Sequence, residues 1–354
     1  MKILSINSSP RTGGQSKTER MLHHLVEGMR KTGAEVEVVN LREKRINNCI
    51  GCFTCWTKTP GKCIHKDDMT KELFPKWLKS DLAVYATPLY QYTLNAEMKR
   101  FIERTLPVLE PFFEQRENRT VHPLRQTLPD AVVLSVAGFM EMSVFDQLSS
   151  YVNFLFGRHS KLLAEIYRPA AESLSRIKAK RAEVFAATHQ AGKELVESRR
   201  VSAETLNRIQ QPTTDFDTFA QIGNVFWKTC IAEGVTPKEF GEKNMIPRPD
   251  SIESFMLLFP SGLNSETVGA QKVILQFDFS GEAAGSCCFT IEKGNISAEK
   301  GSKENPDITI KTPFELWMDI MTGKADGQQM FMDQKYEVDG DLSLMIQLFQ
   351  KQTD

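Results

Sequence analysis

The chain has 354 residues, of which 41% are hydrophobic and 25% charged, and its formal net charge is −1. This length favours two domains, and the composition is typical of a globular protein. The balanced charge gives no indication of a nucleic-acid partner, and the longest apolar runs, such as residues 255–259, are far too short to span a bilayer.

The N-terminal residues predict a strand, a polar loop and a helix. They contain no sustained apolar stretch, so we expect no export signal and a cytoplasmic protein with reduced cysteines. Residues 2–7 are typical of a short buried strand, and the apolar residues of 21–29 share one helix face. Between them, residues 8–16, SSPRTGGQS, could aim backbone N–H groups and hydroxyls at a phosphate, with an ordinary polar turn as the alternative. The motifs GxGxxG and GxxxxGK(S/T) are absent, which argues against a dinucleotide fingerprint and a P-loop.

Alternating strands and helices continue along the first half of the chain. Further strands are predicted at residues 35–41, 81–88, 130–138 and 162–168, with helical patterns between them, for example over 96–106. This order indicates an α/β fold with a doubly wound parallel sheet, in which ligands bind beyond the carboxyl ends of the strands. The loops at those ends are residues 8–16, 87–92 and 136–141, and the second offers Tyr90 and Tyr92 as stacking faces. A phosphate cradle beside an aromatic wall suits a mononucleotide such as FMN.

Four of the seven cysteines lie within residues 49–63, CIGCFTCWTKTPGKC, with the spacing C-x2-C-x2-C-x7-C. Short spacers let successive thiolates converge on an iron–sulfur cluster, although bacterial ferredoxins have a shorter last spacer followed by proline. Zinc more often takes two separated C-x2-C pairs. The third alternative is an active-site loop without metal. The residues leave these three alternatives open.

The last third of the chain has a different character. Residues 241–251 are rich in Gly, Pro and polar side chains and are predicted to be a linker between domains at 1–240 and 252–354. After it, residues 271–281 and 286–297 predict two adjacent antiparallel strands, 306–312 a further strand, 314–323 a helix, and the remainder to Phe349 helical structure. This order indicates a smaller α+β domain.

The first loop and the loop after the third strand resemble those of a known family. SSPRTGGQS is similar to the SPRxxGN(S/T) loop of flavodoxin-like NAD(P)H-dependent FMN reductases, and residues 86–104, ATPLYQYTLNAEMKRFIER, resemble their PxY…K-x-F-x-(D/E)-R stretch. The resemblance implies FMN as cofactor, NAD(P)H as substrate, and ping-pong reduction of a quinone or another conjugated acceptor. It also implies a homo-oligomer, a dimer in particular, because flavin sites in this family often lie at subunit interfaces. The residues that it assigns to the FMN phosphate are Ser9, Arg11, Gln15 and Ser16, and those near the ring are Thr87, Pro88, Leu89, Tyr90, Ala137 and Gly138. Gln15 stands where the family has Asn.

Two further resemblances concern the cysteines and the C-terminal domain. The cysteine run resembles that of iron–sulfur flavoproteins, a branch of the same family, which implies Cys49, Cys52, Cys55 and Cys63 as ligands of a 4Fe–4S cluster near FMN. Residues 306–349, with KYEVDGD as the turn into the last helix, resemble sterol-carrier-protein type 2 domains. That resemblance implies an apolar ligand between sheet and helices. Residues that could line its site, with ordinary core packing as the alternative for each, are Phe277, Phe289, Trp317, Met318, Met321, Phe331, Met332 and Met345.

No catalytic residue is assigned. Neither a Ser–His–Asp set nor paired carboxylates can be argued from the sequence, which fits an enzyme whose cofactor carries the chemistry. Asp67 and Asp68 precede a helical pattern and are predicted to cap a helix. The alternative function is a non-catalytic electron carrier or lipid-binding protein that uses flavin as a redox relay, which would show little NAD(P)H turnover without a protein partner.

Overall fold

The computed structural model describes residues 1–116, 118–175, 177–269 and 271–349. Its contacts divide the chain into two compact units, residues 1–213 and 214–354. The helix α7 (Phe216–Ala232), which the sequence places in the first domain, is therefore grouped with the second unit, as is α8 (Pro237–Glu242), which spans the predicted boundary at residue 240. Residues 245–250, within the predicted linker, form no helix or strand.

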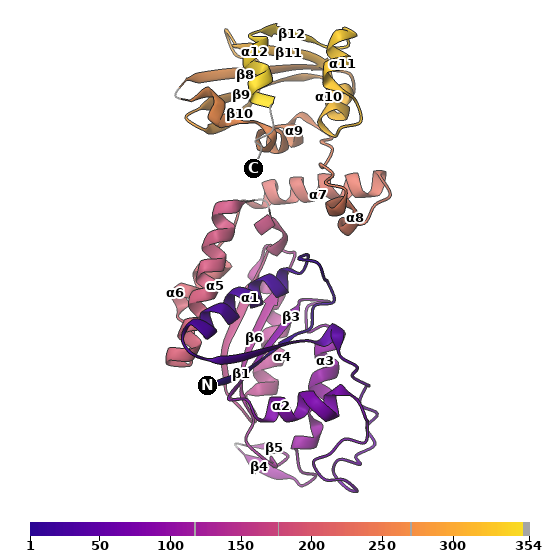
Figure 1. The fold of residues 1–354 in the computed structure, drawn as a ribbon, viewed down its shortest axis with the longest axis vertical. Coiled ribbons are helices and arrows are strands. Elements are labelled where there is room, and N and C mark those ends of the chain that lie inside the picture. Colours follow the sequence, from indigo (N-terminus) through magenta and orange to yellow (C-terminus); the bar gives the residue numbers. More distant parts are fainter. Residues whose placement is uncertain (117, 176, 270, 350–354) are drawn as a thin grey trace. The chain divides into compact units, whose positions relative to one another are not determined.

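The first unit is built on five parallel strands in the order β2-β1-β3-β6-β7. Figure 1 labels β1, β3 and β6 of this sheet. The strands are β1 (Lys2–Asn7), β2 (Glu35–Asn40), β3 (Leu82–Pro88), β6 (Asp130–Val136) and β7 (Leu162–Arg168). This is the flavodoxin-like strand order, in which the switch point for ligand binding lies between β1 and β3. The predicted doubly wound sheet and its five strands are confirmed.

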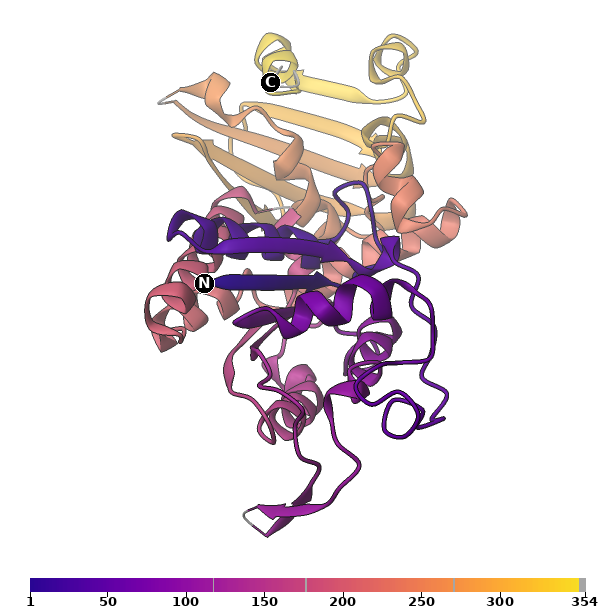
Figure 2. The ribbon, with the colours of Figure 1, turned by 60° about the horizontal axis from the view of Figure 1, so that its bottom comes forward.

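Helices cover both faces of this sheet and form a separate core on each. Because successive side chains of a strand point to opposite faces, alternate residues of β3 enter different cores. Leu82 and Val84 of β3 join the core under α1 (Lys17–Lys31), α5 (Lys178–Ser198) and α6 (Ala203–Gln210). Ala83 and Tyr85 join the core under α2 (Phe74–Leu78), α3 (Ala96–Glu103) and α4 (Asp146–Phe156). A π-helical turn, Met69–Leu73, leads into α2. The hairpin of β4 (Glu114–Arg116) and β5 (Arg119–Val121) projects from this unit (Figure 2).

Two glycines set the packing of α1 against α5. A Cβ atom on Gly28 would lie 1.9 Å from the backbone oxygen of His189, and one on Gly192 would lie 2.1 Å from that of Leu25. The two helix backbones therefore approach more closely than any side chain at these positions would allow.

The second unit has its own five-stranded sheet, in the order β10-β9-β8-β11-β12. Its strands are β8 (Lys272–Ser280), β9 (Gly285–Glu292), β10 (Asn295–Lys300), β11 (Ile308–Pro313) and β12 (Glu337–Gly340), and its further helices are α9 (Ile252–Leu258), α10 (Phe314–Met321), α11 (Gly327–Met332) and α12 (Leu342–Phe349). Only β11 and β8 pair in parallel, so the predicted α+β character is confirmed. None of the helices in the described ranges is long and apolar enough to cross a membrane.

Two local predictions in the second unit are wrong. The strand predicted over residues 286–297 is two strands, because Lys293 and Gly294 adopt positive φ angles of 50° and 77° and turn the chain between β9 and β10. The segment KYEVDGD is more than a turn, since it contains β12, which pairs with β11 at the edge of the sheet.

Candidate functional site

The loop of residues 8–16 runs from the carboxyl end of β1 into α1. The Ser16 hydroxyl caps the helix, accepting from the Glu19 N–H (3.0 Å) and donating to the Ser9 hydroxyl (2.7 Å). Gly13 and Gly14 have φ angles of 63° and 76°, and nothing lies within 4 Å of a Cβ atom at either position. The loop is thus fixed by small buried side chains at its ends and is open at its glycines.

Asn95 joins this loop to the loop that follows β3. Its Nδ2 donates to the Ser8 carbonyl (2.7 Å), while its Oδ1 caps α3 by accepting from the Met98 N–H (3.2 Å) and also accepts from the Thr87 hydroxyl (3.3 Å). Asn95 was not predicted from the sequence, although an Asn directly before a helical pattern indicates an N-cap. Thr87 is fully buried and bonded within the protein, so it shapes the loop from inside.

An aromatic wall stands at the same edge of the sheet. Tyr90 and Tyr92 are 42% and 50% exposed, and Tyr92 stacks on Phe139 with ring centroids 6.2 Å apart. Gln91 and Tyr92 both have left-handed φ angles, 47° and 64°. Such conformations cost non-glycine residues about 1–3 kcal/mol each and concentrate at functional sites. The loop therefore has a strained backbone where the sequence predicts the flavin ring.

The loop after β6 completes this edge. The Leu89 N–H donates to the Val136 carbonyl (3.0 Å), and the Ala137 N–H donates to the Arg168 carbonyl (3.0 Å). Gly138 is exposed, with nothing within 4 Å of a Cβ position. The structure thus brings all the predicted flavin residues to the carboxyl edge of the sheet. Pro88 and Ala137 are buried there, so they shape the loops and do not present a side chain to a ligand.

Arg42, Glu19 and Glu172 also bear on the loop of 8–16 and were not assigned by the sequence. Arg42 donates to the carbonyls of Ser9 (3.3 Å) and Arg11 (3.3 Å) and pairs with Glu19 (3.0 Å). Glu172, which follows β7, pairs with Arg11 (2.9 Å) and with Lys17 (3.2 Å).

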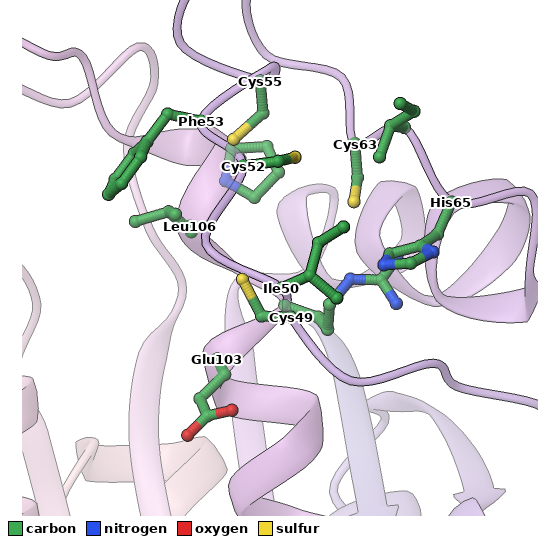
Figure 3. Close-up of a pocket in the computed structure, with 12 residues that line it drawn as sticks. Cys49, Ile50, Cys52, Phe53, Cys55, Cys63, His65, Glu103 and Leu106 are labelled. Atoms are coloured by element: carbon green, nitrogen blue, oxygen red, sulfur yellow. The ribbon is translucent and has the colours of Figure 1, made fainter.

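The four cysteines line one pocket (Figure 3). Burial, followed by the nearby thiols of Cys63, Cys49 and Cys52, raises the pKa of Cys55. Other residues that line the pocket include Ile50, Phe53, His65 and Arg104. Within the described ranges, no group of three or more His, Cys, Asp or Glu side chains is arranged to hold a metal ion. The donor set itself, four thiols around one pocket, has the chemistry of iron–sulfur and zinc ligands.

A buried ion pair closes the cysteine loop at its base. Arg104 binds both carboxylate oxygens of Asp67 (2.6 and 3.1 Å), and its Nη1 also donates to the Asn47 carbonyl (2.6 Å). The two side chains are 1% and 0% exposed. Burial opposes ionisation of Asp67, yet hydrogen bonds from Arg104, Asn47 and Thr70 hold its pKa well below the usual range. The predicted helix cap is present at Asp67, which accepts from the Thr70 N–H (3.1 Å), but not at Asp68, which accepts from the Arg45 N–H instead (2.7 Å). The pairing of Asp67 with Arg104 was not predicted.

A second cavity, of about 320 Å³, adjoins the cysteine pocket. The two share Cys63, Arg104 and Pro107. The far wall of this cavity is largely apolar and includes Met69 of the π-helical turn and Phe74 of α2.

Family comparisons match both ends of the chain. Residues 1–136 match the family model described as NADPH-dependent FMN reductase, and residues 264–351 match the SCP-2 sterol transfer family. The predicted resemblances to FMN reductases and to sterol-carrier-protein type 2 domains are confirmed.

Curated relatives are similar to the N-terminal part. An iron–sulfur flavoprotein of Archaeoglobus fulgidus is 40% identical over 107 residues, 30% of this chain and 46% of that protein. An iron–sulfur flavoprotein of Methanocaldococcus jannaschii is 33% identical over 109 residues, 31% of this chain and 52% of that protein. The chain thus spans about half the length of these relatives. A solved NAD(P)H:quinone oxidoreductase from Methanothermobacter marburgensis is 16% identical, with a TM-score of 0.43, over 55% of this chain and 96% of that one.

The predicted apolar lining of the second unit is mostly buried, but Met321 and Phe331 are half-buried and pack against the core. Phe277, Phe289 and Trp317 are buried in one core with Met318 and Met345. The Trp317 ring lies 5.0 Å from that of Phe277, and its buried N–H makes no hydrogen bond to any described residue. By contrast, Met332 is 61% exposed.

Proposed function

We propose that this protein is an FMN-dependent NAD(P)H oxidoreductase that reduces a quinone or another conjugated acceptor by a ping-pong mechanism. The observation that carries the proposal is the bond network through Asn95, which fixes the loop of 8–16 and the loop of 87–92 as one surface at the switch point of the sheet. The match of residues 1–136 to the FMN reductase family supports it.

The residues at this edge fit FMN. Ser9, Ser16 and the N-terminal N–H groups of α1 would bind the phosphate, with Arg11 and Gln15 at the rim. Leu89, Tyr90 and Gly138 would lie against the ring, and the open space over Gly138 lets a flat ligand approach the backbone. Bound FMN would accept hydride from NAD(P)H and pass reducing equivalents to the second substrate.

We further propose that Cys49, Cys52, Cys55 and Cys63 hold one 4Fe–4S cluster. Their placement around one pocket supports this, as do the names of the relatives, which are iron–sulfur flavoproteins. A cluster would add one-electron exchange to the two-electron chemistry of the flavin. Arg104 lines the same pocket, and its positive charge would offset part of the charge of the thiolates.

The second unit is proposed to bind an apolar ligand, supported by the match to the SCP-2 sterol transfer family and by its aromatic core. Such a unit could present a lipophilic acceptor to the flavin. A homo-oligomer is proposed on the family resemblance alone.

One experiment on the anaerobically purified chain tests the proposal. FMN, iron and acid-labile sulfide are quantified, and NAD(P)H oxidation is followed with and without a soluble quinone. We expect FMN, about four irons per chain, and oxidation that depends on the quinone. If the chain contains no flavin, the proposed FMN site is refuted. If it contains flavin but no iron, the cysteine loop holds zinc or no metal. If it contains both cofactors but does not oxidise NAD(P)H, the alternative function as an electron carrier is favoured.

A further inference from the structure

Each cation that contacts the loop of 8–16 or begins α1 is paired with a carboxylate of the protein. Arg42 pairs with Glu19, and both Arg11 and Lys17 pair with Glu172. Two carboxylates thus face three cations, so most of the charge that would attract a phosphate is already offset from within the chain.

The two pairings differ in how easily they can be broken. Arg42 is 17% exposed and also donates to the carbonyls of Ser9 and Arg11, so it helps to hold the backbone of the loop in place. Glu172 is 54% exposed, and of its two partners Arg11 is 50% exposed and Lys17 16% exposed. The pair with Arg11 is therefore an exposed ion pair, which is worth only about 0–1 kcal/mol. Glu172 is thus the carboxylate that can give way to an incoming anion.

Glu172 is held in front of these cations by a fixed backbone. The N–H of its neighbour Ala171 donates to the Ala137 carbonyl (2.9 Å), and the hydroxyl of Ser173 donates to the Ala170 carbonyl (2.6 Å). Although the Glu172 side chain is about half exposed, partial desolvation by its neighbours opposes its ionisation; Lys17 and Arg11 outweigh this and lower its pKa, so the group is charged at neutral pH. A phosphate monoester brings a charge of about −1.5 to −2, and the Glu172 carboxylate would repel it.

Resting on the FMN site proposed above, we infer that Glu172 is an internal counter-ion that occupies Arg11 and Lys17 until the flavin phosphate replaces it. Glu172 then weakens the binding of phosphorylated flavin and does not affect flavin that lacks the phosphate. It therefore sets how strongly the site prefers FMN to riboflavin.

The test compares the affinity for FMN and riboflavin in the full-length, flavin-free chain, measured by flavin fluorescence at low ionic strength. We expect Glu172→Gln to bind FMN roughly five- to tenfold more tightly, as removal of one nearby repelling charge predicts, and to bind riboflavin unchanged. The gain should shrink in high salt, which screens exposed charges. Glu43→Gln is the matched control, since Glu43 is also exposed at this edge but pairs with Arg42 (3.7 Å).

Three outcomes would overturn the inference. Weaker FMN binding by Glu172→Gln would make Glu172 a support that positions Arg11 and Lys17. An equal change for both flavins would mean an effect on site shape, and an equal gain in Glu43→Gln would mean a general charge effect. If the wild-type chain binds neither flavin, the proposed function itself is refuted, and the inference falls with it.

Discussion

Three of the four cysteines of residues 49–63 are at least partly exposed, whereas both cysteines of β9 are buried. Cys52 is exposed, and hydrogen bonding by Thr54 lowers its pKa. Cys287 is fully buried, and burial raises its pKa to about 12. Cys52 therefore ionises more easily than an ordinary thiol, whereas Cys287 behaves as a small apolar side chain.

The two groups also differ in what holds them in place. Cys287 and Cys288 are fixed by a strand ladder in which each residue has a partner on β8. Most of the cysteine loop forms neither helix nor strand, and both of its ends are bonded to Arg104 through Asn47 and Asp67. Regular backbone pairing is spread along the whole strand, whereas the two ends of the loop converge on one buried ion pair.

The largest expected effect is on alkylation of the metal-free chain by iodoacetamide at pH 8. Because the thiolate is the reactive form, we expect Cys52 to react at least about a thousandfold faster than Cys287. The rate of Cys287 should rise with pH until its raised pKa near 12 is reached. Mass spectrometry of the peptides measures both rates, and comparable rates at pH 8 would contradict the contrast between the two groups.

The next effect concerns the base of the cysteine loop. Arg104→Met leaves the carboxylate of Asp67 buried without its partner, which typically costs about 3–5 kcal/mol. We expect a lower urea midpoint for the first unit and faster alkylation of Cys55 and Cys63. The matched control is Lys99→Met, which removes an exposed pair with Glu103 and should cost less than about 1 kcal/mol. Equal midpoints for the two variants would show that the loop does not depend on Arg104.

The features predicted correctly from the sequence are those that depend on neighbouring residues along the chain. Strand runs such as residues 2–7 and the polar loop 8–16 placed the strands of the sheet and its carboxyl edge correctly, and the candidate flavin residues lie at that edge. The cap by Asn95 was also local and could have been found. The turn at Lys293 and Gly294 was overlooked in a segment that otherwise has a strand composition.

What the sequence did not predict are the pairings between distant residues. Asp67 and Arg104 are 37 positions apart, and Arg11 and Glu172 are 161 positions apart. A single charged residue leaves no periodicity that names its partner, and the partner is decided only when the sheet brings loops from different strands together. The charge balance of both candidate sites could therefore be obtained only from the structure.

The smallest expected effect separates the two neighbouring cysteines of β9. Cys287 packs in the aromatic core, so the hydroxyl of Cys287→Ser would be buried without a partner, at a cost of about 1–3 kcal/mol. The Cys288 thiol already lies 3.4 Å from the Gln276 side-chain oxygen and 3.2 Å from the Gly301 carbonyl, which a serine hydroxyl could use instead. We therefore expect Cys288→Ser to cost less than about 1 kcal/mol, as measured by thermal unfolding of the second unit. A larger loss for Cys288→Ser would mean that these bonds do not accommodate a hydroxyl, and that burial alone decides the cost at both positions.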